Sequence, residues 1–247
     1  MTTLWNRMLI DIERELDEHP KDFLRQPIIS KTTCPYMPRL AALYHAGFDA
    51  ADVEKVKDPQ FGNPKISYNG FTLSTLQQYY YLDLILKRDD NLSEWNLITD
   101  IGGGYGNMCR IAHRLGFQGK YEIYDFPIMH KLQRAYFENH PGYYFETGFN
   151  SWKVHQELLQ NIQPCDTKKS IMIATHSLNE MPLKDREKVI SGLGHDRFIF
   201  VYNTQFDGIN NIKWFADLAK QLDDRYDIVD IGCVTNTRAR VMLGTKK

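Results

Sequence analysis

The stretch "LITDIGGGYGNMCRIAHRLG", residues 97–116, indicates how this chain folds. An apolar run leads into Asp100, four glycines follow within five residues, and a helical pattern begins near Asn107. Glycine loses more conformational freedom on folding than any other residue, so a cluster of glycines suggests that something approaches the backbone closely. The stretch therefore predicts a strand, a glycine-rich turn and a helix whose N-terminal amides face a ligand.

From Trp95 onward, short apolar runs alternate with amphipathic stretches. Helices are expected at about 106–116, 128–140, 151–163, 183–192 and 211–223, and strands at 96–101, 120–126, 142–147, 169–176, 197–203, 226–232 and 238–244. Such alternation implies parallel pairing through right-handed crossovers, hence an α/β fold with a doubly wound, mostly parallel, seven-stranded sheet. The last two strands are joined by a short link, which predicts an antiparallel hairpin at the sheet edge.

The first 95 residues show helical periodicity instead. Apolar residues recur every four positions at Leu4, Met8, Ile12 and Leu16, and residues 40–48 and 72–88 form further helix candidates. Prolines argue against a continuous helix over 26–40. We therefore expect residues 1–95 to form a helical cap that closes the ligand site and shapes an acceptor pocket, with residues 96–247 as the α/β domain.

The composition of the chain narrows the classes of partner that we expect it to bind. The net charge is −1 over 247 residues, so no overall field recruits nucleic acid or an acidic membrane surface. No apolar run reaches the length of a membrane span, and the first residues lack the pattern of a signal peptide. The four cysteines show no metal-ligand spacing and are expected to be reduced thiols. We expect a cytoplasmic protein that binds neither nucleic acid nor membrane; a homo-oligomer is left open.

Two known glycine motifs are candidates for the turn. The dinucleotide fingerprint GxGxxG requires a third small residue, but that position holds Asn107 when counting starts at Gly102 and Cys109 when it starts at Gly104. The alternative spacing, acid-x-Gly-x-Gly-x-Gly, is met in full by Asp100, Gly102, Gly104 and Gly106.

A second acid supports a nucleoside ligand. Asp125 ends the second expected strand, 21 residues after Gly104, where nucleotide-binding folds place the carboxylate that accepts ribose hydroxyls. Hydrogen bonds to a charged group contribute roughly 1.5–3 kcal/mol each. Phe126 follows and is expected to lie against an adenine ring.

The acid-glycine spacing resembles motif I of the class I S-adenosylmethionine-dependent methyltransferases. In that family the glycine turn lets the backbone approach the methionine part of the cofactor, and the leading acid helps to hold its amino group. The resemblance implies S-adenosylmethionine as cofactor, held by Asp100, Gly102, Gly103, Gly104, Gly106, Asn107, Asp125, Phe126 and Thr175. Together with "FGNP", "LSTLQQYYYL", "YDFP" and "HSLNEMP", over residues 60–206, the chain is similar to bacterial sugar O-methyltransferases of polysaccharide and glycan gene sets.

In methyltransferases the end of the fourth expected strand, "MIATHSLNEMP" at residues 172–182, faces the transferred methyl group. His176 is the first candidate for the general base, because the unperturbed histidine pKa is about 6.5. Glu180 is expected to orient the imidazole or to replace it as base. One glutamate is too few ligands for a hard cation, so metal-independent chemistry is expected, with Asp207 as the acid that could join Glu180.

The expected acceptor is a small molecule, a sugar or a sugar nucleotide. Its expected contacts are polar groups at strand ends and aromatic rings of the cap: Asn179, Asn203, Gln205, Tyr68 and Tyr79. Three alternatives remain: another small-molecule acceptor, a catalytically silent cofactor-binding partner, and a nicotinamide-dependent oxidoreductase. The missing third glycine and the absence of a Tyr-x-x-x-Lys pair disfavour the last.

Overall fold

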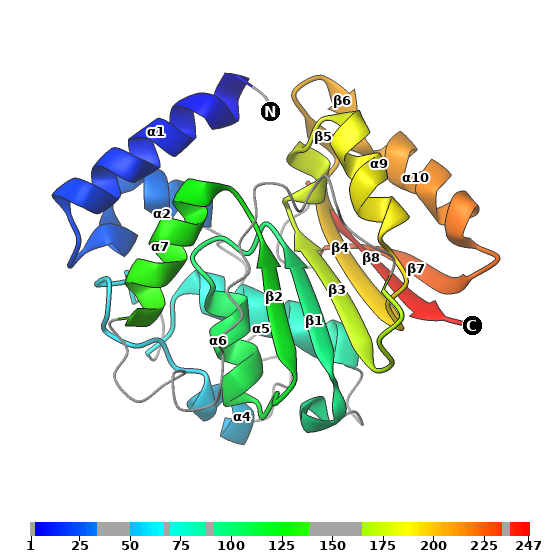
Figure 1. Cartoon of the computed structure of the whole chain (residues 1–247), viewed down its shortest axis with the longest axis horizontal. Coiled ribbons are helices and arrows are strands. Elements are labelled where there is room, and N and C mark those ends of the chain that lie inside the picture. Colours follow the sequence, from blue (N-terminus) through cyan, green and yellow to red (C-terminus); the bar gives the residue numbers. More distant parts are fainter. Residues whose placement is uncertain (1–2, 34–49, 67–69, 87–90, 139–164, 234–237) are drawn as a thin grey trace.

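The computed structural model describes residues 3–33, 50–66, 70–86, 91–138, 165–233 and 238–247. A six-stranded sheet with the order β2-β1-β3-β4-β8-β7 forms its centre, with helices on both faces (Figure 1). The strands are β1 Leu97–Ile101, β2 Lys120–Tyr124, β3 Ser170–Thr175, β4 Arg197–Asn203, β7 Tyr226–Gly232 and β8 Ala239–Lys246.

The sheet is mostly parallel, as predicted. β1 pairs in parallel with β2 on one side and β3 on the other, and β3 pairs in parallel with β4. β8 lies antiparallel between β4 and β7, which confirms the hairpin expected at the end of the chain. The strand expected at 142–147 and the helices expected at 40–48 and 151–163 lie outside the described residues.

Two apolar cores, one on each face, hold the sheet between its helices. Ile171 and Ile173 of β3 pack on the face of α5, α6 and α7, while Met172 and Ala174 pack on the face of α9 and α10. Strands that are covered on both faces require apolar residues at nearly every position, which explains their unbroken apolar runs. The helices are α5 Leu73–Leu86, α6 Asn107–Arg114, α7 Pro127–Glu138, α9 Leu183–Ser191 and α10 Asn211–Leu222.

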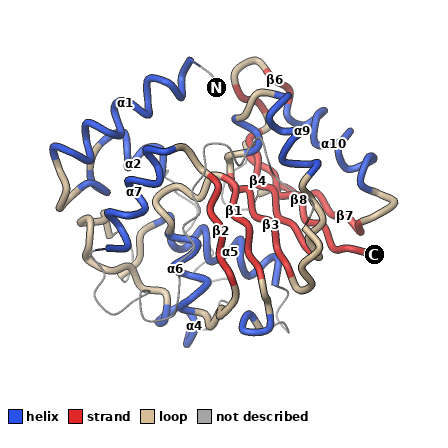
Figure 2. The backbone as a smooth tube through the Cα atoms, viewed as in Figure 1, coloured by secondary structure: helices blue, strands red, loops and turns tan. Residues whose placement is uncertain are grey.

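The N-terminal part is helical, as the periodicity predicted (Figure 2). Its helices before α5 are α1 Thr3–Glu18, α2 Pro27–Thr33 and α4 Ala50–Lys55. The remaining short elements are the 3-10 turns Phe23–Arg25, Leu92–Glu94 and Leu178–Glu180, and the hairpin of β5 Gln205–Phe206 with β6 Ile209–Asn210.

A short helix, α2, occupies the first part of the segment that its prolines had marked as broken. Pro27 stands at the first helical position, where its missing N–H costs nothing. The carboxylate of Glu15 on α1 accepts hydrogen bonds from the amides of Ile28 and Ile29, at 3.0 and 2.9 Å. These bonds satisfy amides that the first turn of a helix leaves unpaired, so α1 stabilises the start of α2.

α5 joins the N-terminal part to the sheet. It packs against α6 and β4, and its Leu76, Tyr79 and Leu82 belong to the core of that face. The division at residue 95 into a cap and an α/β domain stays a prediction. No helix among the described residues has both the length and the apolar character needed to cross a membrane.

Candidate functional site

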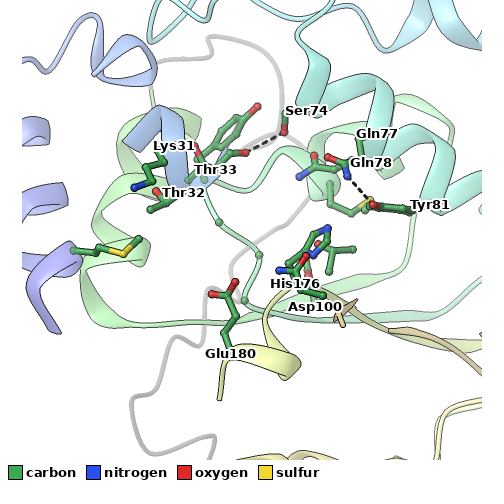
Figure 3. A pocket seen from close by; sticks show the side chains of 18 of the residues that line it. Lys31, Thr32, Thr33, Ser74, Gln77, Gln78, Tyr81, Asp100, His176 and Glu180 are labelled. Atoms are coloured by element: carbon green, nitrogen blue, oxygen red, sulfur yellow. Dashed lines mark hydrogen bonds between the residues drawn. The ribbon is translucent and has the colours of Figure 1, made fainter. Parts of the chain in front are cut away.

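A cavity of about 360 Å³ opens at the carboxyl ends of β1 and β3. Strand order reverses between these two strands, and ligands of open α/β sheets bind at such a point. Small-molecule sites enclose roughly 300–1,000 Å³, so the cavity is large enough for one. Its walls come from the glycine turn, from the loop after β3 and from α1, α2 and α5 (Figure 3).

Two glycines of the turn serve different purposes. At Gly104, where φ is +58°, an added Cβ would meet only the Cγ2 atom of Thr33, at 3.8 Å across the cavity wall. At Gly106, where φ is +93°, an added Cβ would stand 2.4 Å from the ring of Phe137. Gly102, Gly103 and Gly104 line the cavity. Gly104 therefore leaves its space open to a ligand, whereas Gly106 allows the turn to pack against α7.

Asp100 supplies a buried negative group to the cavity. Its side chain lines the cavity, the residue is 1% exposed, and one carboxylate oxygen accepts a hydrogen bond of 2.9 Å from the hydroxyl of Tyr121. Burial raises the pKa of Asp100 to about 7, and the Tyr121 hydrogen bond opposes that rise. A positively charged group in the cavity would stabilise the ionised carboxylate, so this wall suits an ammonium group.

Asp125 holds the glycine turn in place. Its two carboxylate oxygens accept hydrogen bonds from the amides of Gly104, at 3.0 Å, and Phe126, at 2.8 Å. Burial raises the pKa of Asp125 to about 7, while these amides lower it. Asp125 and Phe126 are not among the residues that line the cavity, and the Phe126 ring packs 5.7 Å from that of Trp5. Their contacts with ribose and adenine stay predictions.

His176 faces the cavity with its hydrogen-bonding capacity unused. Neither ring nitrogen has a hydrogen-bond partner in the described structure, and the ring lies edge-on to Tyr81 with 6.5 Å between centroids. Burial lowers the pKa of His176 to about 4, so the imidazole is neutral near pH 7. Its backbone is left-handed, with φ at +62°, a conformation that costs a non-glycine residue on the order of 1–3 kcal/mol and is concentrated at functional sites.

Glu180 lines the same cavity from the turn after β3. Its carboxylate accepts a hydrogen bond of 2.9 Å from the indole N–H of Trp5. Burial raises the pKa of Glu180 to about 7, and the Trp5 hydrogen bond opposes the rise. Because both nitrogens of His176 are without partners, Glu180 does not orient the imidazole in this geometry, contrary to one of the two roles expected for it.

The other predicted cofactor contacts separate into two groups. Thr175 lines the cavity. The Asn107 side chain instead lies in the core, where it donates to the hydroxyl of Thr75 and accepts from the guanidinium of Arg110, each at 2.8 Å. Thr75 in turn donates to Asp58, so Asn107 belongs to a buried polar network that ties α6 to α5. A cofactor contact through its side chain does not fit these bonds.

Of the predicted acceptor contacts, Asn203 lines the cavity and three others do not. Tyr79 is 5% exposed and packs in the core, Asn179 is fully buried within the turn after β3, and Gln205 is exposed on the β5–β6 hairpin. Tyr68 lies outside the described residues. No group of three metal-ligating side chains occurs in the part of the chain that the structure describes.

The N-terminal helices contribute cavity residues that sequence reasoning missed. Trp5 and Met8 come from α1, and a polar stripe on α5 consists of Ser74, Gln77, Gln78 and Tyr81. These four stand at i, i+3, i+4 and i+7, which places them on one face of the helix. Within the stripe, Gln77 donates to the Tyr81 hydroxyl at 2.6 Å (Figure 3). Polar residues at helical spacing on a mostly apolar helix were the signal that could have identified them.

No protein-family profile and no curated protein matches the sequence. Among solved structures, the chain is similar to magnesium protoporphyrin IX methyltransferase of Synechocystis with S-adenosylmethionine bound, at 19% identity and a TM-score of 0.50 over 84% of this chain and 97% of that one. A candidate RNA methyltransferase of Pyrococcus horikoshii matches at 13% identity and a TM-score of 0.51, over 85% and 99%.

An O-methyltransferase family protein of Burkholderia thailandensis matches with 13% identity and a TM-score of 0.48. That match covers 70% of this chain, which spans 57% of the other protein's length. At such identities a structural likeness shows the fold. The chain has a Rossmann-like fold, which it shares with the Synechocystis methyltransferase that binds S-adenosylmethionine.

Proposed function

We propose that this protein is an S-adenosylmethionine-dependent O-methyltransferase that acts on a hydroxyl of a small molecule. One observation carries the proposal: a single cavity joins the open face of Gly104, the buried carboxylate of Asp100 and the polar loop that bears His176. A nicotinamide cofactor provides no amino acid group for Asp100, whereas S-adenosylmethionine carries an ammonium group at one end.

The residues of the cavity fit this cofactor. Asp100 would pair with its ammonium group, since a buried carboxylate with one hydroxyl partner is stabilised by a nearby cation. The missing side chain at Gly104 would let the backbone meet the amino acid portion closely. When bound, the cofactor supplies a methyl group already activated for transfer.

The chain then has to align the acceptor hydroxyl and remove its proton. Alignment can contribute on the order of 7–11 kcal/mol, and a positioned base about 10²–10⁴-fold in rate. We assign the base to His176, because this residue lines the cavity and neither of its ring nitrogens has a hydrogen-bond partner in the described structure, whereas Glu180 already accepts from Trp5. Geometry takes precedence over pKa in choosing a base, and an imidazole with a pKa of about 4 is unprotonated throughout the neutral range.

A sugar or sugar nucleotide is the acceptor class that we propose. The resemblance of the flanking motifs supports it, and so does the polar wall that Gln77, Gln78 and Asn203 give the cavity. Gln78 presents a buried carbonyl oxygen without a partner in the described structure, which a ligand hydroxyl would satisfy.

Thermal denaturation with candidate ligands tests the cofactor. S-adenosylhomocysteine should raise the melting temperature, and NAD should leave it unchanged; the reverse result would favour an oxidoreductase. Release of S-adenosylhomocysteine during incubation with S-adenosylmethionine and a panel of nucleoside diphosphate sugars tests the acceptor. Binding of the cofactor without release on any member of this panel, or on a second panel of phenols, would favour a silent cofactor-binding partner.

A further inference from the structure

Trp5 bridges the two sides of the glycine turn. It lies in the first turn of α1, and its indole N–H donates to Glu180, which follows β3, while its ring packs 5.7 Å from Phe126, which follows β2. β2 and β3 flank β1, whose end carries the turn. The indole therefore spans the carboxyl edge of the sheet above the turn. Trp5 and Met8, three residues apart on one face of α1, both line the cavity.

The Trp5 indole is positioned by its own contacts, because the groups that anchor α1 lie in the other half of the helix. The second half of α1 is anchored by Ile12 and Leu16, which are buried in the core, and by an exposed ion pair between Asp17 and Lys131 of α7. Exposed ion pairs contribute little to stability, so the apolar contacts dominate that anchor. The first turn of α1 lies two turns away, where the bond from Trp5 to Glu180 links it to the loop after β3.

The charges around the cavity are unbalanced. Among the described residues that line it, two carboxylates, Asp100 and Glu180, face a single cationic side chain, that of Lys31, which is exposed at the rim. S-adenosylmethionine carries two positive groups, the ammonium and the sulfonium, whereas the product S-adenosylhomocysteine has lost the second. With Asp100 paired to the ammonium, Glu180 is left as a match for the second charge.

An indole adds to this match. Trp is the aromatic side chain that attracts cations most strongly, and the attraction grows when the site is shielded from water. The bond from its N–H also fixes the Glu180 carboxylate beside the ring, so an anion and an aromatic group act from one corner of the cavity. Neither group donates a hydrogen bond to the ligand. This suits a sulfonium, because a sulfonium carries positive charge but cannot accept a hydrogen bond.

We infer that Trp5 and Glu180 recognise the sulfonium charge, so that the site binds the charged cofactor more tightly than the neutral product. The inference rests on the proposed function. It assigns the N-terminal helix a direct part in cofactor selection, and it gives the enzyme a way to release S-adenosylhomocysteine after each turnover.

Calorimetric titration with two ligands tests this inference. Sinefungin carries an ammonium group where the cofactor has its sulfonium, and S-adenosylhomocysteine carries no charge there. The wild-type chain should bind sinefungin more tightly. Trp5→Leu should reduce that preference, the ratio of the two dissociation constants, by about 5- to 30-fold, the loss expected for a shielded cation–π contact. Ile10→Ala, on the same helix at a residue 68% exposed, should leave the ratio unchanged.

Glu180→Gln is the second variant, because it keeps the shape of the side chain and removes its charge. It should also lower the preference for sinefungin, even if Trp5→Leu fails to fold. An unchanged ratio in the folded variants, or equal losses for both ligands, would overturn the inference and leave Trp5 as a packing residue. Failure of the wild-type chain to bind either ligand would instead overturn the proposed function.

Discussion

Replacing Gly104 or Gly106 by alanine separates ligand binding from folding. Both glycines have a positive φ, +58° and +93°, so either alanine places an L-residue in the left-handed region, at a cost of roughly 1–2 kcal/mol. At Gly104 the new methyl group meets only Thr33, at 3.8 Å, and projects into the cavity. At Gly106 it stands 2.4 Å from the Phe137 ring, and such overpacking adds about 1–3 kcal/mol.

The two variants should therefore lose different properties: Gly104→Ala mainly affinity for the ligand, and Gly106→Ala mainly stability. Gly104→Ala should lower the melting temperature by roughly 2–8 °C, since 1 kcal/mol corresponds to about 2–4 °C at this size, yet it should abolish measurable binding of S-adenosylhomocysteine. Gly106→Ala should lose more stability than Gly104→Ala. Scanning fluorimetry measures the stabilities, and isothermal titration calorimetry measures the affinities. Binding by Gly104→Ala within twofold of wild type would refute the assignment of Gly104 to the ligand.

Three further predictions concern the titratable groups. Asp125→Ala should weaken binding of S-adenosylhomocysteine by about 10- to 150-fold in calorimetry if it holds the ribose, and a change below twofold would assign the ribose elsewhere. Asp100→Asn should weaken the same binding yet raise the melting temperature of the unliganded chain, more at pH 8 than at pH 5. Burial raises the folded-state pKa of Asp100 from 3.8 to about 7, so its ionisation destabilises the fold increasingly between pH 3.8 and about 7 and by a constant amount above that range; no gain at pH 8 would contradict this. His176→Ala should lower kcat by about 10²–10⁴-fold, and wild-type kcat at saturating cofactor should fall only as pH drops towards 4, where the imidazole becomes protonated. A fall near pH 7 that Glu180→Gln removes would transfer the role of base to Glu180.

The sequence was most informative where burial is complete. β4, in which residues 198–202 are all buried, has the predicted bounds, Arg197–Asn203, because an apolar run between turn residues has few other ways to bury itself. The edge strand β7 also has its predicted bounds, Tyr226–Gly232, although Tyr226 is its only buried residue. The antiparallel pairing of β8 with β7 followed from a link too short to hold a crossover helix. The helix at Pro27–Thr33 was missed, because its start depends on Glu15 from a different helix.

The site was predictable on one side only. Asp100, Gly104 and His176 lie at or just after the ends of strands, and the carboxyl ends of parallel strands meet at a known edge. Trp5 reaches that edge through packing between segments 175 residues apart, which no local pattern encodes. Asn107 is a polar residue at the expected place for a ligand contact, but its side-chain amide is used in a buried network. Sequence alone does not distinguish a polar residue that faces a ligand from one that faces the core.

Calorimetric titration of the unmodified chain with S-adenosylhomocysteine tests the central claim most directly. We expect saturable binding to one site per chain, together with no heat of binding from NAD. That result would show that the chain binds a nucleoside linked to an amino acid, the ligand that we assign to the cavity between the glycine turn and His176. Saturable binding of NAD, with none of S-adenosylhomocysteine, would contradict the assignment of this protein as a methyltransferase.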